Sequence, residues 1–479
     1  MSKLKSLNIR GSLKVSGLEY LNDPGEATQA NLKKKNLDDL KLIWSHNVFF
    51  NDYIEWSLPV LEALQPPSII TRLYLEGYPG EQYPNWMMLS VETRMTMFPN
   101  LTSLTLSHLK RCSNLPSLAG LSQLEYLKLQ GMPCLTNCSS YFPSLAKLHL
   151  CEMSNLEEVT TMNLNTNNVY EPAFPRLSKL EISGCPKLRL QPYLPPSVVE
   201  LILEKSKELH ERTITYCEGI HALPEGLGEL KSLEMLVIKN TPLTSLPQSM
   251  QHLSSLRVLT IEDCKGLHAL PEWLGELKSL EELVIWNTPL TSLPQSMQHM
   301  SSLRELTFCN FHHFLPLLEW LGELKSLEQL TIMGTPLTCL PQSIQHMSSL
   351  RILTIVGWEG HNALPEWMGE LKSLEQLDIL DTPLTCLPES MKHMSSLREL
   401  TFECCKGLRV LPEWFGELKS LKVLEIDDTP LTCLPKSMKQ LTALESLSIW
   451  SCPELERRCE REKGEDWHLI SHIPNVHIQ

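Results

Sequence analysis

Short runs in which apolar residues alternate with variable, often polar residues recur through the C-terminal half of the chain. Leu236 and Ile238 are separated by one residue and flanked by Met235 and Lys239, and apolar residues at period two indicate a strand with one buried face. A small polar residue such as Thr241 follows the run, and then a Leu-Pro pair that stops a helix. The pattern predicts one short strand per segment, followed by a turn that leads back to the next strand.

The segments recur in fixed register. The tripeptide Thr-Pro-Leu starts five times at intervals of 47 residues, at Thr241, Thr288, Thr335, Thr382 and Thr429. Each 47-residue unit divides into halves of 23 and 24 residues that follow L-x-x-L-x-I-x-x-(T/C)-x-x-L-x-x-L-P. Recurrence of this pattern every 20–29 or so residues is the signature of leucine-rich repeats, whose coils bury their leucines only when stacked.

The repeat predicts an α/β leucine-rich-repeat solenoid: a curved horseshoe with a parallel β-sheet on its concave face and irregular or short helical turns on its convex face. We expect irregular repeats over 1–205, regular repeats over 206–453 with the five double repeats from about 218, and a C-terminal cap over 454–479. The opening segment is expected to hold strands at 4–9, 13–15, 37–42 and 73–75. A helix is expected to start at Asp23-Pro24 and to run through Gly25 to Lys35.

Composition narrows the possible functions. The 479 residues are 42% hydrophobic, which supports a folded core, and 42 Lys+Arg against 56 Asp+Glu give a net charge of −14. That balance argues against a nucleic-acid partner, because phosphate binding needs clustered cations. The 15 cysteines are scattered, and no apolar run is long enough for a signal peptide or a membrane span. We therefore expect a cytoplasmic protein without membrane insertion, with the nucleus as a second location.

Motifs for catalysis are missing from the sequence. The patterns G-x-x-x-x-G-K-[ST], G-x-S-x-G and H-E-x-x-H do not occur. Cys134 and Cys138 have no second pair at metal-site spacing, and His312-His313 are interpreted as loop residues. We expect no enzyme activity, no cofactor and no metal.

The outward strand positions are the candidate site, because the copies differ there while framework strings such as GELKSL are identical. Aromatic side chains among charges are typical of protein-binding surfaces. Drift at solvent-exposed positions is the alternative explanation of the same differences. The candidate protein-binding residues are Met235, Val237, Lys239, Glu262, Glu282, Val284, Trp286, Gln329, Thr331, Met333, Gln376, Asp378, Leu380, Glu403, Glu425, Asp427 and Trp450.

Three blocks resemble a known family. They are GSLKVSGLEYLNDPGEATQANLKKKNLDDLKLIW (Gly11 to Trp44), LQPPSIITRLYLEGYPGEQYPNWM (Leu64 to Met87) and CPELERRCEREKGEDWHLISHIPNVHI (Cys452 to Ile478). They are similar to the leucine-rich-repeat region of plant coiled-coil-type nucleotide-binding disease-resistance proteins. The nucleotide-binding domain of that family, with its phosphate loop, has no counterpart in this sequence, so ATP binding is not assigned to it.

The resemblance implies a non-enzymatic recognition module in plant innate immunity. In that family the repeats detect a pathogen effector or a modified host protein, so the implied partner is a protein ligand of the concave face. A nucleotide-binding switch domain, in cis or in trans, is a further implied partner. The alternative is an intracellular leucine-rich-repeat scaffold or adaptor for signalling proteins outside immunity.

Overall fold

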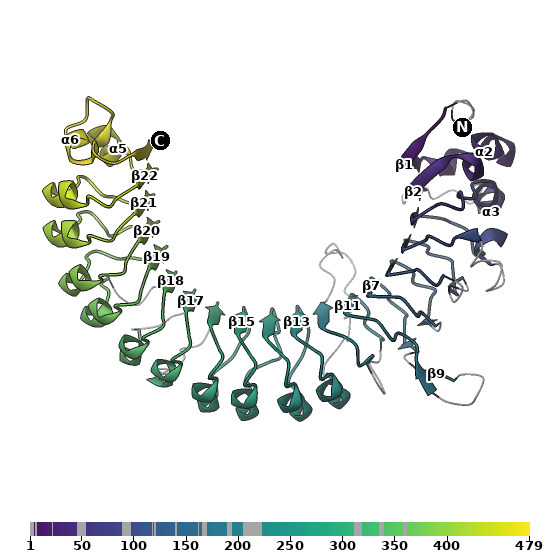
Figure 1. The fold of residues 1–479 in the computed structure, drawn as a ribbon, viewed down its shortest axis with the longest axis horizontal. Coiled ribbons are helices and arrows are strands. Elements are labelled where there is room, and N and C mark those ends of the chain that lie inside the picture. Colours follow the sequence, from purple (N-terminus) through teal and green to yellow (C-terminus); the bar gives the residue numbers. More distant parts are fainter. Residues whose placement is uncertain are drawn as a thin grey trace. The chain divides into compact units, whose positions relative to one another are not determined.

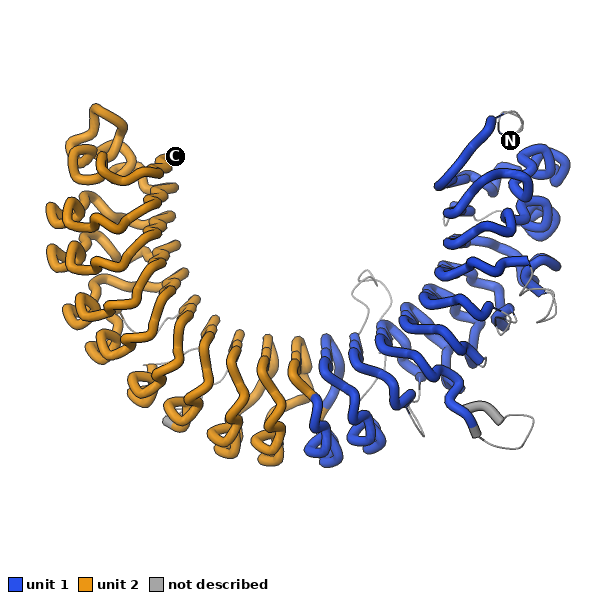
Figure 2. The backbone as a smooth tube through the Cα atoms, viewed as in Figure 1, with its two compact units in different colours: residues 1–243, 247–255 blue, residues 244–246, 256–479 orange. Residues whose placement is uncertain are grey.

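The computed structural model forms two compact units. It describes residues 4, 7–21, 23–45, 54–88, 97–116, 118, 121–138, 141–160, 162–164, 170–188, 194–204, 223–310, 319–334, 340–357 and 362–479. Unit 1 comprises Met1–Leu243 and Pro247–Ser255, and unit 2 comprises Thr244–Leu246 and Leu256–Gln479 (Figure 2).

Unit 1 contains a parallel sheet in which each strand pairs with the next one in the stack. Its strands are β1 (Arg10–Ser16), β2 (Asn36–Ile43), β3 (Arg72–Glu76), β4 (Ser103–Ser107), β5 (Tyr126–Gln130), β7 (Lys147–Cys151), β11 (Lys179–Ser183), β12 (Glu200–Glu204) and β13 (Met235–Lys239). Two small ribbons lie outside it, β6 (Asn137–Cys138) with β8 (Glu158–Val159), and β9 (Met162–Leu164) with β10 (Tyr170–Pro172). Its helices are α2 (Pro24–Ala30), α3 (Ile54–Ala63) and the 3-10 helices η1 (Leu18–Tyr20), η2 (Leu32–Lys34), η4 (Asn85–Met87), η5 (Glu225–Glu229) and η6 (Gln248–His252).

Unit 2 is more regular, with parallel strands on one side of the stack and 3-10 helices on the other (Figure 1). Its strands are β14 (Val258–Glu262), β15 (Glu282–Trp286), β16 (Glu305–Cys309), β17 (Gln329–Met333), β18 (Ile352–Val356), β19 (Gln376–Leu380), β20 (Glu399–Glu403), β21 (Val423–Asp427), β22 (Ser446–Trp450) and β23 (Asn475–Ile478). The 3-10 helices are η7 (Glu272–Glu276), η8 (Gln295–His299), η9 (Glu319–Glu323), η10 (Gln342–His346), η11 (Glu366–Glu370), η12 (Glu389–His393), η13 (Glu413–Glu417) and η14 (Lys436–Gln440). Within each unit, the parallel sheet and short helical turns confirm the predicted solenoid architecture.

One coil explains how the repeat pattern produces this fold. In β15, Leu283 and Ile285 are fully buried, whereas Glu282, Val284 and Trp286 alternate with them on the outer side. Burial of each such aliphatic side chain contributes about 1.5–3 kcal/mol, and only stacked coils supply the buried surroundings. Pro294 then holds an extended conformation (φ −68°, ψ 138°) directly before η8, where its missing N–H is no loss.

A glycine–serine contact joins the 3-10 helices in pairs. A Cβ atom on Gly275 in η7 would lie 2.2 Å from the carbonyl oxygen of Ser296 in η8, and the same glycine of the other four copies gives 2.2 to 2.4 Å. The helix that follows carries a long side chain at this position, such as Gln298 in η8. Glycine therefore alternates with a long side chain from coil to coil, which accounts for a repeat of two coils instead of one.

The opening segment partly matches its prediction. The strands expected at 13–15, 37–42 and 73–75 lie within β1, β2 and β3, and Asp23 begins α2 by accepting a hydrogen bond from the Gly25 N–H (2.8 Å). The helix is shorter than expected because Asn31, in a left-handed conformation (φ 48°), ends it after Ala30; η2 follows.

The strand expected at 4–9 is wrong. Residues 7–9 form no strand, and β1 begins at Arg10. The neighbouring β2 starts opposite Arg10 at Asn36, so earlier residues have no strand to pair with. Instead, the Lys35 ammonium donates to the carbonyl oxygens of Leu4 (2.8 Å) and Leu7 (2.6 Å).

The tail covers the end of the stack. α5 (Pro453–Cys459) and α6 (Trp467–Ile470) precede β23, which pairs in parallel with β22. Ile470 and Ile473 are buried, as expected for residues that close a coil. The Arg458 guanidinium donates to both carboxylate oxygens of Asp466, each at 2.8 Å, and the Leu434 N–H donates to the same carboxylate at 3.3 Å. An ion pair with a buried carboxylate thus anchors the tail to the last regular coil.

Candidate functional site

The outward residues of β14 to β22 form one surface. Each strand has five residues, of which the second and fourth are buried. We call the first, third and fifth residues of these nine strands the strand face of unit 2. Fourteen of the predicted site residues lie on it, namely Glu262, Glu282, Val284, Trp286, Gln329, Thr331, Met333, Gln376, Asp378, Leu380, Glu403, Glu425, Asp427 and Trp450. Met235, Val237 and Lys239 occupy the same positions on β13, which belongs to unit 1.

Left-handed residues end the strands and keep this face in register. Asp263 (φ 54°) and Asn287 (φ 46°) follow β14 and β15, and Gly334 (φ 52°) follows β17. Asn, Asp and Gly tolerate this conformation best. The Asp263 N–H donates to the Trp286 carbonyl (2.9 Å), so the turn of one coil is bonded to the strand of the next. Sequence reasoning missed this role, although an Asn, Asp or Gly directly after seven of the nine strands β14 to β22 carries the signal.

An apolar stripe runs along the fifth strand position. The strand register places Trp286 beside Cys309, then Met333, Val356 and Leu380, on five successive strands. The Cys309 side chain is buried (2% exposed), whereas the other four are at least partly exposed. Neighbouring strands lie about 4.8 Å apart, so the stripe is about 19 Å long. Sequence reasoning selected Trp286, Met333 and Leu380 but left out Cys309 and Val356, because only the register shows that the two half-repeats alternate in one column.

Carboxylates surround the stripe. Beyond Leu380 the fifth position continues with Glu403, Asp427 and then Trp450, whose side chain is 49% exposed. The strand face carries eight carboxylates and no Lys or Arg at any of its positions. The eight are Glu262, Glu282, Glu305, Asp378, Glu399, Glu403, Glu425 and Asp427.

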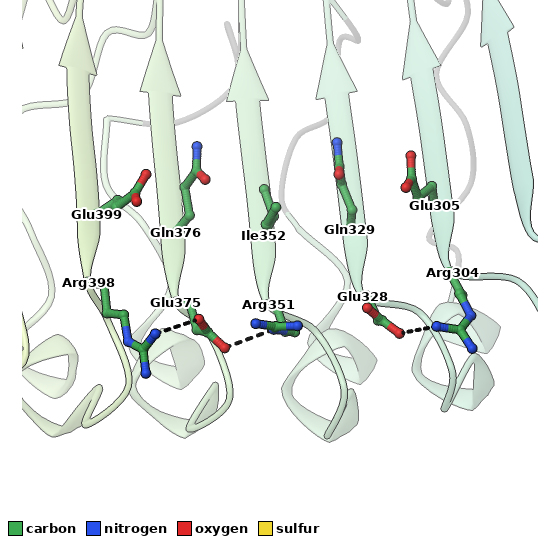
Figure 3. A pocket seen from close by; sticks show the side chains of 10 residues that line it. All are labelled: Arg304, Glu305, Glu328, Gln329, Arg351, Ile352, Glu375, Gln376, Arg398 and Glu399. Atoms are coloured by element: carbon green, nitrogen blue, oxygen red, sulfur yellow. Dashed lines mark hydrogen bonds and ion pairs between the residues drawn. The ribbon is translucent and has the colours of Figure 1, made fainter. Parts of the chain in front are cut away.

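A ladder of alternating charges borders this face where the strands begin. Arg304 pairs with Glu328 (3.0 Å), and Glu375 accepts from both Arg351 (2.8 Å) and Arg398 (3.4 Å), as Figure 3 shows. The hydrogen bond from Arg351 holds the pKa of Glu375 below its ordinary value. The same edge includes Arg257–Glu281 (2.7 Å) and Lys422–Glu445 (2.6 Å). Because these side chains are largely exposed, the ion pairs add little to the stability of the fold. Their main effect is to hold the paired side chains in fixed orientations.

A groove of about 450 Å³ lies between this ladder and the strand face. Its floor includes the first residues of the strands, among them Gln329, Ile352 and Gln376 (Figure 3). The lining residues are amides, carboxylates, guanidiniums and one isoleucine, so the groove offers hydrogen bonds and paired charges. Groups of this kind are suited to contacts with another polypeptide.

Comparisons with known proteins agree with this architecture. One family model, described as R13L1/DRL21 LRRs, matches residues 1–132, and another, described as a leucine-rich repeat region, matches residues 207–314. Disease resistance protein RGA2 of Solanum bulbocastanum is 29% identical over 260 residues, which are 48% of this chain and 25% of that protein. Putative disease resistance RPP13-like protein 1 of Arabidopsis thaliana is 27% identical over 293 residues, 53% of this chain and 27% of that protein. The chain is a leucine-rich-repeat region that is similar to those of plant disease-resistance proteins.

This leucine-rich-repeat region spans about a quarter of the length of the curated relatives that it matches (25% of RGA2). Solved structures share its fold. A leucine-rich-repeat protein of Leptospira interrogans gives a TM-score of 0.53 at 21% identity, covering 97% of this chain and all (100%) of that one. A chain of the Drosophila Toll–Spätzle complex gives 0.63 at 16% identity, covering 92% of this chain and 58% of that one. Leucine-rich repeats typically serve as protein-interaction modules.

One thiol lies within the stripe. Burial raises the pKa of the Cys309 thiol to about 11, so this cysteine of the stripe is neutral at physiological pH. Among the described residues, no group of three His, Cys, Asp or Glu side chains could hold a metal ion. Within the same residues, no helix is long and apolar enough to cross a membrane.

Proposed function

We propose that this leucine-rich-repeat region is a protein-recognition module of plant defence, which binds a pathogen effector or a modified host protein through the strand face of unit 2. The observation that carries the proposal is the apolar stripe from Trp286 to Leu380, set among carboxylates on the sheet surface. Exposed aromatic anchors ringed by polar groups are the features that dominate binding energy at protein interfaces. The similarity to disease-resistance proteins supports the defence context.

Trp286 and Trp450 are the two anchors to test. Their side chains are 36% and 49% exposed, although both belong to strands whose alternate residues are fully buried. Each can be truncated without opening the core, because neither side chain takes part in it. If both are hot spots, each Trp→Ala change should cost about 2 kcal/mol of binding free energy, which is about a 30-fold loss of affinity.

The experiment compares three forms of the chain. The wild type, the variant Trp286→Ala/Trp450→Ala and a control variant are immobilised and exposed to extracts of healthy and infected plant tissue. The control, Gln295→Ala/Lys436→Ala, alters exposed side chains on η8 and η14, on the helical side of unit 2. Captured proteins are identified by mass spectrometry, and the affinity of each purified candidate is then measured by calorimetry.

The proposal predicts a partner that the wild type and the control retain and the tryptophan variant loses. Partners held equally by all three forms would show that binding uses another surface. Partners that are unrelated to infection and to defence would favour the scaffold function over the recognition function.

A further inference from the structure

The charge on the strand face of unit 2 is one-sided. Its nine strands contribute eight carboxylates and no Lys or Arg. The stretches of unit 2 outside the described residues, 311–318, 335–339 and 358–361, also contain no Lys or Arg in the sequence. The arginines of the bordering ladder form ion pairs with carboxylates of the ladder itself, such as Arg304–Glu328 and Arg351–Glu375. The face therefore carries a net negative charge.

Some of these carboxylates are direct neighbours. The register places Glu282 opposite Glu305, and Glu403 opposite Asp427, on strands about 4.8 Å apart. Like charges in such positions destabilise a sheet. Burial and the neighbouring Glu305 raise the pKa of Glu282. The Oδ1 atom of Asp427 is buried and has no hydrogen-bond donor among the described residues. Gln or Asn at these positions would destabilise the fold less than Glu or Asp. The carboxylates therefore point to an external cationic group.

Unit 1 shows that the repeat does not require this bias. The outward positions of its strands carry eight cations: Arg10, Lys14, Lys41, Arg72, Lys128, Lys147, Lys179 and Lys239. Some of them have acidic partners on the same sheet, as in Lys179–Glu200 at 3.0 Å. The same scaffold thus accepts lysine and arginine at these positions in unit 1, whereas the corresponding face of unit 2 has none.

We infer that the strand face of unit 2 binds a protein segment that presents apolar side chains flanked by lysine or arginine. This inference rests on the proposed function and names the chemistry of the partner. The apolar stripe would cover the partner's apolar side chains, and the carboxylates beside it, above all Glu403 and Asp427, would pair with its cations. Charge complementarity selects this occupant, because phosphates would be repelled and a purely polar polyamine would leave the stripe uncovered.

Peptide probes test the two parts of the inference. Three fluorescein-labelled peptides of equal length alternate lysine with leucine, lysine with serine, or glutamate with leucine, and their binding to the whole chain is measured by fluorescence anisotropy. The lysine–leucine peptide should bind at least about tenfold more tightly than either other peptide. Its affinity should fall as salt rises from about 50 to about 200 mM, because salt screens exposed charges. Equal affinity for the glutamate–leucine peptide overturns the charge argument, and equal affinity for the lysine–serine peptide overturns the role of the stripe.

Matched variants locate the binding. Glu403→Gln/Asp427→Asn removes two charges from the strand face with little change of shape, and should weaken the lysine–leucine peptide by about fivefold or more. Glu276→Gln/Glu417→Gln removes two exposed charges from η7 and η13 on the helical side, and should change the affinity by less than about twofold. Circular dichroism confirms that each variant is folded. An equal loss in both variants would mean that the peptide follows net charge, which overturns the inference.

The partner captured under the proposed function separates the two hypotheses. If Trp286→Ala/Trp450→Ala abolishes capture while Glu403→Gln/Asp427→Asn leaves it intact, the strand face binds a partner but the cationic chemistry is wrong. If capture survives the tryptophan substitutions, the proposed face itself is wrong. Loss of capture in both variants supports both statements.

Discussion

Replacing Gly275 by alanine tests how neighbouring coils are held together. Gly275 lies in η7, and a Cβ atom there would stand 2.2 Å from the carbonyl oxygen of Ser296, 2.6 Å from its carbonyl carbon and 2.8 Å from its Cβ atom. The closest of these are backbone atoms of η8, which cannot rotate away as a side chain could. The two helices would have to separate by about 1 Å to reach ordinary van der Waals contact.

Two opposing effects set the size of the stability change caused by Gly275→Ala. Gly275 does not have a positive φ, so alanine fits the backbone and would stabilise the chain by about 0.4–1 kcal/mol through the unfolded state. Overpacking of a close contact costs about 1–3 kcal/mol, and a backbone obstacle belongs at the upper end of that range. The cost of the clash should exceed this gain, with a net loss of about 1–2 kcal/mol in the free energy of unfolding.

Native-state hydrogen exchange, together with urea unfolding, measures this loss. In a solenoid each coil contacts only its neighbours, so amide protection should fall most in the coils of η7 and η8 and less toward β22. Glu276→Ala is the matched control, since it places alanine at an exposed position of the same helix and should change stability by less than about 0.5 kcal/mol. A Gly275→Ala protein as stable as the wild type, or more stable, would refute the view that the glycine contact pairs the coils.

Three further predictions follow from named contacts. Asp466→Ala should destabilise the tail by about 2 kcal/mol, because it leaves the Leu434 N–H without its acceptor and the Arg458 guanidinium with Glu465 alone. Early loss of amide protection in α5 and α6 measures this effect, and unchanged protection contradicts it. Glu282→Gln should raise stability by up to about 1 kcal/mol at neutral pH. The pKa of Glu282 is raised on folding, so its charged carboxylate destabilises the fold above that pKa, and this penalty disappears as the pH falls below the pKa of the unfolded state. The stability gained by Glu282→Gln should therefore vanish in acid. A gain that is independent of pH would exclude the carboxylate charge as its cause. The single change Trp286→Ala should weaken partner binding by about 2 kcal/mol while leaving the melting temperature within about 2 °C, and a large drop in melting temperature would assign that tryptophan to packing.

Features of the fold that depend only on the spacing of residues along the chain could be predicted from the sequence. Buried residues such as Leu283 and Ile285 repeat at period two, and the coil repeats at fixed length, so strands, turns and stacking follow without a structure. The left-handed residues and the Gly275–Ser296 contact also recur in the sequence, but their meaning appears only when one coil lies against the next.

The candidate site was harder to predict because it is assembled across coils. Cys309 and Val356 complete the apolar stripe, yet they are about a coil length away in sequence from Trp286 and Met333. The absence of cations from the strand face likewise becomes visible only once outward positions of separate strands are seen as one surface. The missed start of β1 had another cause, since a strand exists only where a neighbour pairs with it.

Chemical footprinting of the chain, alone and with its captured partner, tests the central claim most directly. Carboxylates are labelled with a carbodiimide and tryptophans are oxidised, and mass spectrometry locates the protected residues. The account predicts protection of Trp286, Trp450, Glu403 and Asp427 in the complex, with Glu276 and Glu417 of the helical side labelled as in the free chain. Protection of the helical side with the strand face still labelled would contradict it.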